Sequence, residues 1–175
     1  MNAAAATVSQ KWRVATTASK SVVWRTPPAL FLALDKEFDF TIDVAADDGN
    51  AHVDRYFDAE QDGLAQPWGA ERIFCNPPYG RDLKLWVAKA VLESQEKGAL
   101  VVLLLPARTG NSWFHQYCLP HAEVRFIRGR LNFSKHRVGS KRYRAPFDSM
   151  VVVFHPFRIG EGHIRTQPTF PGFER

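Results

Sequence analysis

Residues 100–105 have the sequence LVVLLL, an unbroken apolar run that starts two positions after Gly98. A run of this kind, with no alternating polar residues, is typical of a strand that is buried on both faces of a parallel sheet. The stretch before it predicts a helix, because the apolar residues between 83 and 91 share one stripe after Asp82. Gly98 is a natural end for that helix. Helix and strand together indicate an α/β fold.

Further segments extend the pattern in both directions. Residues 38–44 alternate between apolar and polar side chains, as a strand does, and residues 73–75 form a short apolar segment. Two more strands are expected at residues 124–127 and 150–154. Strands that alternate with helices predict a sheet that is largely parallel.

Two other helices are expected, at residues 29–36 and 112–117. Thr26 is the predicted N-cap of the first, with Pro27 at its first position. Ligands of open α/β sheets bind outside the carboxyl ends of the strands. Three predicted loops leave such ends and should form one crevice, namely residues 43–50, 76–81 and 106–111.

The second of these loops has the sequence CNPPYG, residues 75–80. The side-chain oxygen of Asn76 and the carbonyl of Pro77 can both accept hydrogen bonds from one planar amino group. Pro77 and Pro78 have no N–H and a restricted φ, which holds these acceptors in place, and Tyr79 offers a ring on which a base can stack. The segment fits methyl transfer to an exocyclic nitrogen, or else a Pro-Pro turn in which Tyr79 covers the core.

The charge of the chain is concentrated in one segment. The net charge is +5 with a pI near 9.4, and residues 125–144 contain eight Lys or Arg and no acid. A single arginine is more often a solvated surface charge, but a cluster indicates a polyanionic partner. The candidates for phosphate contacts are Arg108, Arg128, Arg130, Lys135, Arg137, Lys141 and Arg142.

Composition limits the other classes of protein. Cys75 and Cys118 are too few for a disulfide framework. No apolar run reaches the roughly 20 residues that span a bilayer, and the first residues do not form a signal peptide, so we expect a soluble cytoplasmic protein. His115, Cys118 and His121 have no fourth ligand nearby, and no metal site is expected.

The length fits one domain. We expect a flexible arm over residues 1–20, a single domain over residues 21–158 and an irregular tail over residues 159–175.

Five short segments occur here in an order that resembles a known family. They are WRTPP at residues 24–28, DVAA at 43–46, CNPPY at 75–79, LPART at 105–109 and RGRLNF at 128–133. The order is similar to that of the phage-type DNA N-6-adenine methyltransferases, the Dam family of phages and prophages. The likeness runs from about residue 22 to residue 157.

The resemblance implies a reduced, Rossmann-like sheet of the S-adenosylmethionine-dependent methyltransferases, in a single domain with a basic C-terminal insertion. It implies S-adenosylmethionine as the methyl donor and adenine in double-stranded DNA as the acceptor, in the cytoplasm of a bacterial host. Carried over to this chain, Asn76, Pro77, Pro78 and Tyr79 form the site for the target base.

The resemblance also places residues at the donor. Asp43 would contact its methionine end, Thr26 and Pro27 would border its pocket, and Asp62 would lie near its adenosine. Ala45 begins the loop that stands where larger amino-methyltransferases have a Gly-rich loop, and no acidic residue for the ribose is evident. No separate target-recognition domain is visible, so DNA recognition would come from the basic insertion or from a partner subunit, as in a homodimer.

Other functions share the same chemical logic. Enzymes that methylate an amine in RNA or a glutamine amide in a protein also present a planar amino group to this tetrapeptide. A nucleic-acid-binding protein that keeps the fold without the activity is the alternative from a different class. Binding of S-adenosylmethionine distinguishes that class from the enzymes.

Overall fold

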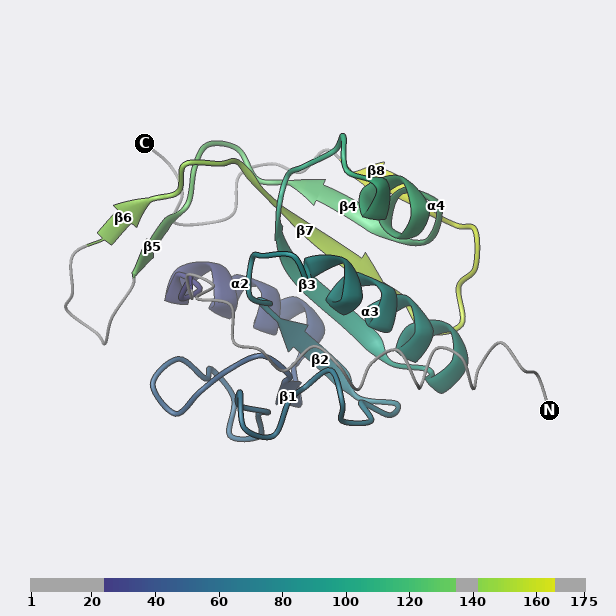
Figure 1. Cartoon of the computed structure of the whole chain (residues 1–175), viewed down its shortest axis with the longest axis horizontal. Coiled ribbons are helices and arrows are strands. Elements are labelled where there is room, and N and C mark those ends of the chain that lie inside the picture. The colour runs from purple at the N-terminus through teal and green to yellow at the C-terminus, as the bar shows by residue number, and fades with distance from the viewer. Residues whose placement is uncertain (1–23, 135–141, 166–175) are drawn as a thin grey trace.

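A six-stranded sheet lies at the centre of the computed structural model, which describes residues 24–134 and 142–165 (Figure 1). Its strands, in spatial order, are β1 (Ile42–Asp43), β2 (Arg72–Cys75), β3 (Leu100–Pro106), β7 (Ser149–Phe154), β4 (Glu123–Phe126) and β8 (His163–Arg165). β1, β2 and β3 are parallel, β7 is antiparallel to both of its neighbours, and β8 is parallel to β4. The fold is therefore mixed α/β, and the buried strand at residues 100–105 is confirmed.

Helices cover both faces of this sheet (Figure 1). Helix α2 (Pro28–Phe38) buries Leu30 and Leu34 against one face, where they meet Phe74 of β2. Helix α3 (Leu83–Lys97) buries its apolar stripe against the other face. Because side chains alternate along a strand, neighbouring residues of β2 and β3 enter opposite cores. The predicted end of α3 at Gly98 is confirmed, and Gly98 has a left-handed φ of 75°.

The predicted helix at residues 112–117 has a different form. A π-helical turn, η2 (Phe114–Cys118), continues directly into a short α-helix, α4 (Leu119–His121). The turn buries Phe114 and Cys118.

Two predictions around the first helix are wrong. The N-cap of α2 is Pro27, whose side chain has no hydrogen-bonding group, and the Thr26 hydroxyl accepts from Asn76 instead of capping the helix. The strand predicted at residues 38–44 is reduced to β1, since α2 continues to Phe38 and Asp39 then takes a left-handed φ of 52°. Phe38 and Phe40 are buried in the core beside α2, which explains why the alternating pattern resembled a longer strand.

The basic stretch forms a second, two-stranded sheet of β5 (Asn132–Ser134) and β6 (Arg142–Arg144), which extends away from the main sheet (Figure 1). At the other end of the chain, β8 corrects the irregular tail predicted from residue 159, because its backbone pairs with β4. The predicted arm at residues 1–20 lies outside the described residues. No helix in the described part of the chain is long and apolar enough to cross a membrane.

Candidate active site

The parallel strands bring the predicted loops to one edge of the sheet. Asp43 is in register with Phe74, and Cys75 with Leu103, so the chain leaves β1, β2 and β3 on the same side. β7 begins at this edge, because Ser149 pairs with Pro106 at the end of β3. Side chains from segments that are distant in sequence can therefore meet here.

Asn76 follows β2 and is held by residues from the start of the described chain. Its Nδ2 donates to the carbonyl of Trp24 (2.5 Å) and to the hydroxyl of Thr26 (3.1 Å). Its Oδ1 is buried and has no hydrogen-bond partner among the described residues. A buried oxygen without a partner is disfavoured by about 1–3 kcal/mol. The described residues thus leave one acceptor of Asn76 without a donor.

Tyr79 is also held in place. Its hydroxyl donates to the carbonyl of Leu104 (3.0 Å), and its ring meets the ring of Phe147 edge to face, with centroids 5.5 Å apart. Burial raises the pKa of the phenol well above its usual value. Tyr79 is therefore a neutral, oriented aromatic group. Phe147 was missed in the sequence, because it precedes β7 and reaches Tyr79 only through the fold.

Asp43 ends β1 as a buried carboxyl group. Only 3% of its surface is exposed, and one oxygen accepts a hydrogen bond from the backbone N–H of Ala45 (3.1 Å). Burial raises its pKa to about 7, against the lowering effect of the Ala45 N–H, and the charge of Asp47 raises it further. The register with Phe74 puts Asp43 on the α2 side of the sheet, the side from which Thr26 reaches Asn76.

The segment around Asp62 packs onto the end of β1. A Cβ on Gly63 would lie 2.0 Å from the carbonyl oxygen of Val44, so the two backbones are in direct contact. The indole of Trp68 donates to the Gly63 carbonyl (2.8 Å) and fixes this approach. The loop that contains Asp62 thus reaches the end of β1, and the role of Asp62 near the donor stays a prediction.

The outer edge of β1 carries a segment that the sequence did not reveal. Asp43 exchanges backbone hydrogen bonds with Arg55 (3.0 Å) and Phe57 (2.9 Å), and Phe57 also accepts from Ala46 (3.1 Å). Residues 55–57 thus run parallel to β1 like a further strand, and Asp58 follows them. Sequence signals are weak here, because a single isolated bridge carries no periodic pattern.

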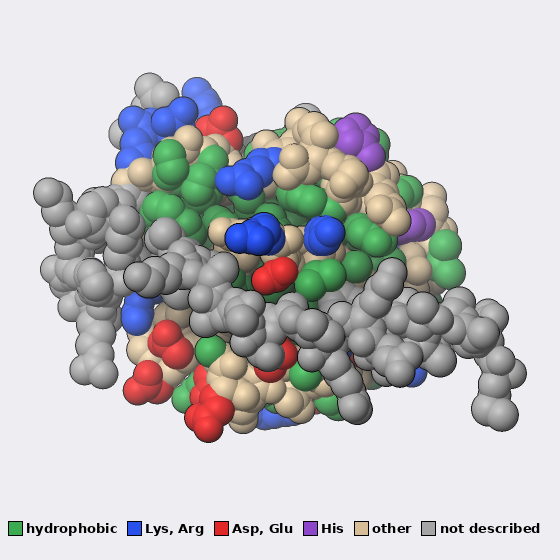
Figure 2. All heavy atoms as spheres, in the orientation of Figure 1, with side chains coloured by type: hydrophobic (Ala, Val, Ile, Leu, Met, Phe, Trp, Pro, Cys, Tyr) green, Lys and Arg blue, Asp and Glu red, His purple; other side chains and the backbone are tan. Residues whose placement is uncertain are grey.

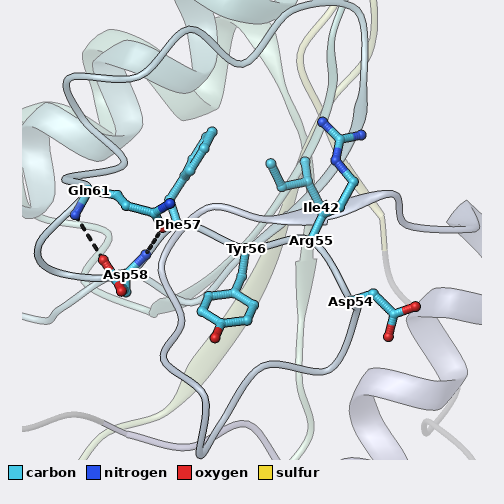
Figure 3. Close-up of a pocket in the computed structure, with 7 residues that line it drawn as sticks. All are labelled: Ile42, Asp54, Arg55, Tyr56, Phe57, Asp58 and Gln61. Carbon is cyan, nitrogen blue, oxygen red and sulfur yellow. Dashed lines mark hydrogen bonds between the residues drawn. The ribbon is translucent and has the colours of Figure 1, made fainter.

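A pocket of about 330 Å³ opens beside this segment (Figure 3). Its lining consists of Ile42, Asp54, Arg55, Tyr56, Phe57, Asp58 and Gln61. The Asp58 carboxylate accepts from the backbone N–H of Gln61 (2.8 Å), and the Gln61 side chain accepts from the N–H of Asp58 (3.1 Å), which orders the turn.

Exposed arginines follow the same edge of the sheet. Arg108 comes after β3, while Arg128 and Arg130 come after β4, and all three are exposed. Figure 2 shows cationic side chains at the upper left, near β5–β6, and in the middle of this face, and acidic side chains mainly at the lower left, near the loops that follow β1. Of the other predicted phosphate contacts, Lys135, Arg137 and Lys141 lie outside the described residues, and Arg142 belongs to β6.

One member of the basic run is not a surface charge. Arg125 is only 1% exposed, and its guanidinium pairs with Glu37 (2.7 Å) and Glu123 (2.5 Å). The eight cations of this segment are therefore not all free to meet a polyanion. The ion pair of Arg125 with Glu37 instead links β4 to α2.

No group of three or more His, Cys, Asp or Glu suited to a metal ion occurs within residues 24–134 and 142–165. His121, one of the three residues considered for a metal, accepts a hydrogen bond at Nδ1 from the backbone of Gly160 (3.1 Å).

Comparison with known proteins supports the family that the order of the motifs indicated. The sequence model of the family described as DNA N-6-adenine-methyltransferase (Dam) matches residues 13–169. The DNA N-6-adenine-methyltransferase of Escherichia phage T1 is 29% identical over 111 residues, which cover 62% of this chain and 46% of that protein. The chain thus aligns with about half the length of this curated relative. The chain belongs to the DNA N-6-adenine-methyltransferase (Dam) family.

Proposed function

We propose that this protein transfers a methyl group from S-adenosylmethionine to the N6 amine of adenine in DNA, at the Asn76-Pro77-Pro78-Tyr79 site. The observation that carries the proposal is the buried Oδ1 of Asn76, which lacks a partner while its Nδ2 is held twice. An exocyclic amine is a donor of the right kind for that oxygen. Membership of the family supports adenine in DNA as the acceptor.

The end of β1 fits the donor. S-adenosylmethionine supplies an electrophilic methyl group on a positively charged sulfur. The Asp43 carboxyl forms no ion pair within the described residues, and a cation nearby would favour its ionised form, which burial now disfavours. Ala45 and Asp62 would border the same ligand.

Two further residues complete the donor site in this proposal. Asp58 ends the segment beside β1, where folds that bind nucleotides place an acid for the ribose hydroxyls. Pro27 is the N-cap of α2, which lies on the same side of the sheet as Asp43, and, as the family implies, it would border the donor pocket.

The residues of the tetrapeptide act mainly by orientation. Oδ1 of Asn76 and the Pro77 carbonyl accept the two N–H groups of the amine, which aims its lone pair along the line of displacement. Orientation of this kind can lower a barrier by roughly 7–11 kcal/mol. Tyr79 is not the base, because its hydroxyl already donates to Leu104 and its pKa is raised. The amine loses its proton easily only after methylation, so no strong base is needed.

The target adenine must leave the DNA stack to reach Asn76, which costs a few kcal/mol. Stacking on the Tyr79 ring, which Phe147 supports, offsets part of this cost. The exposed arginines Arg108, Arg128 and Arg130 lie on the same edge of the sheet and would hold the phosphates around the extruded base.

The test incubates the protein and labelled S-adenosylmethionine in three separate reactions. The first contains a DNA duplex, the second the same duplex without adenine, and the third an RNA of the same sequence. We expect N6-methyladenine in the first alone. Asn76→Ala and Tyr79→Ala should bind the donor as the wild type does and lose about 100-fold or more in turnover. Gln116→Ala, an exposed amide on η2, is the matched control and should behave as wild type. Label on RNA alone, or equal turnover in all variants, would contradict the proposal.

A further inference from the structure

The side-chain amide of Asn76 is oriented by a segment that lies 50 residues earlier in the chain. An asparagine amide turns about a soft torsion, so hydrogen bonds rather than rotamer preferences decide which atom points where. The carbonyl of Trp24 can only accept, and it therefore selects Nδ2 over Oδ1 as its neighbour. The hydroxyl of Thr26 accepts from the same nitrogen, which occupies the second N–H of the amide.

We propose that Thr26 is a positioning residue, whose hydroxyl stops the Asn76 amide from turning and so keeps Oδ1 directed at the target amine. This inference rests on the proposed function. It differs from the role that family resemblance gives Thr26, which is to border the donor. Without the hydroxyl, one N–H of a buried amide would lose its acceptor, and the amide would turn to find another.

Thr26 is itself held rigidly enough to act in this way. It is only 6% exposed, and its backbone lies near the His52 ring, where it raises the pKa of that imidazole against the larger lowering effect of burial. The His52 ring stacks on Phe31 of α2, with centroids 4.4 Å apart. Pro27 and Pro28 follow Thr26 directly, just as two prolines follow Asn76, so φ is restricted on both sides of the contact.

The same segment also braces the aromatic side of the site. The Trp24 ring contacts Phe133 of β5 (5.3 Å between centroids) and Phe147 (5.6 Å). Phe147 in turn meets Tyr79. Residues 24–26 thus lie between the base of the β5–β6 hairpin and both functional side chains of the tetrapeptide, which suits a positioning role.

Thr26→Val removes the acceptor and keeps the shape of the side chain, while Thr26→Ser keeps the hydroxyl. We expect Thr26→Val to lower kcat on duplex DNA by ~10- to 100-fold, from the loss of one buried hydrogen bond. The dissociation constant of S-adenosylmethionine should change less than about 2-fold, and Thr26→Ser should restore most of kcat. Thr41→Val is the matched control. Thr41 directly precedes β1, its hydroxyl donates to Glu71 (2.7 Å), and its loss should leave kcat unchanged.

A double-mutant cycle gives a second measurement. If Thr26 acts through Asn76, Thr26→Val should cost nothing further in an Asn76→Ala background. The side-chain amide protons of Asn76, observed by NMR on ¹⁵N-labelled protein, should exchange faster with water in Thr26→Val than in wild type or Thr41→Val. This second readout does not depend on turnover.

The outcomes separate the two hypotheses. A wild type that methylates no DNA overturns the proposed function, and the amide exchange then still decides whether Thr26 holds Asn76. Three results would each overturn the positioning role. They are an unchanged kcat in Thr26→Val, weaker donor binding with unchanged kcat, and an additive loss with Asn76→Ala. The second of these results would assign Thr26 to the donor pocket instead.

Discussion

At the scale of single residues, the site contains two side chains with buried oxygen atoms, and each lacks a different partner. Asn76 lacks a donor for Oδ1, and Asp43 lacks a cation for its carboxyl within the described residues. Buried polar groups are nearly always paired in folded proteins. Under the proposed function, the Asn76 oxygen would accept from the target amine and the Asp43 carboxyl would meet the positive charge of the donor.

The raised pKa of Asp43 gives a prediction about stability. Its pKa rises from 3.8 to about 7 on folding, so the folded state holds one more proton than the unfolded state between these values. The free energy of unfolding should then fall as pH rises through this window and stay low above pH 7. Asp43→Asn has no carboxyl at this position and lacks this loss. Its free energy of unfolding at pH 8 should therefore exceed that of the wild type, by at most roughly 4 kcal/mol.

Urea denaturation at pH 4 and pH 8 measures this difference without donor present. Asp48→Asn, which changes an exposed carboxyl in the following turn and keeps Asp43, is the control, and its free energy of unfolding should differ between the two pH values as that of the wild type does. A gap between Asp43→Asn and wild type that is the same at both pH values would contradict the burial of a titrating carboxyl.

At the scale of elements, the candidate donor side of the site depends on one close backbone contact. Gly63 touches the carbonyl of Val44, and no side chain larger than hydrogen fits between them. The contact brings the loop with Asp62 onto the end of β1. Neither segment has a pattern that predicts the other, because the contact joins the turn after β1 to another turn.

Gly63→Ala should therefore displace this loop. The added Cβ would lie 2.0 Å from a backbone oxygen that cannot move aside, and we expect a loss of about 1–3 kcal/mol in the free energy of unfolding. Donor binding measured by calorimetry should weaken in the same variant. Gly110→Ala, where a Cβ meets nothing within 4 Å, is the control for both measurements. Equal effects of the two substitutions would show that the Gly63 contact does not order the site.

At the scale of the whole molecule, charge is separated along the sheet. In Figure 2, acidic side chains gather mainly near the loops that follow β1, and one group of cationic side chains gathers near the β5–β6 hairpin. The exposed arginines after β3 and β4 lie on the edge that carries Asn76, whereas Lys36 and Lys97 lie near the ends of α2 and α3 at the opposite edge. A polyanion drawn to the first edge would meet the tetrapeptide.

Salt dependence of DNA binding tests this arrangement. Each phosphate contact adds about 0.9 to the slope of log affinity against log salt. A variant with Arg108, Arg128 and Arg130 changed to Gln should reduce the slope by roughly 2–3, if each arginine meets one phosphate. A variant with Lys36 and Lys97 changed to Gln should keep the wild-type slope. Loss of slope in the second variant, and not in the first, would place DNA on the other edge.

The local patterns of the chain predicted much of this molecule. The apolar run at residues 100–105, the strand before Asn76 and the end of α3 at Gly98 were all confirmed, because each depends on neighbours in sequence. The order of the motifs also identified the family, which the comparisons confirmed. A strand was predicted too long at residues 38–44, where core burial imitated strand alternation.

The sequence by itself determined the family, the main elements and the tetrapeptide at the end of β2, because periodicity and motif order are local properties of the chain. Only the tertiary structure decided that Thr26 serves Asn76 rather than α2, that Arg125 is a buried ion-pair partner rather than a surface charge, and that Asp43 is desolvated. These properties depend on contacts between segments that are distant in sequence, and burial and hydrogen-bond partners exist only once those segments have packed.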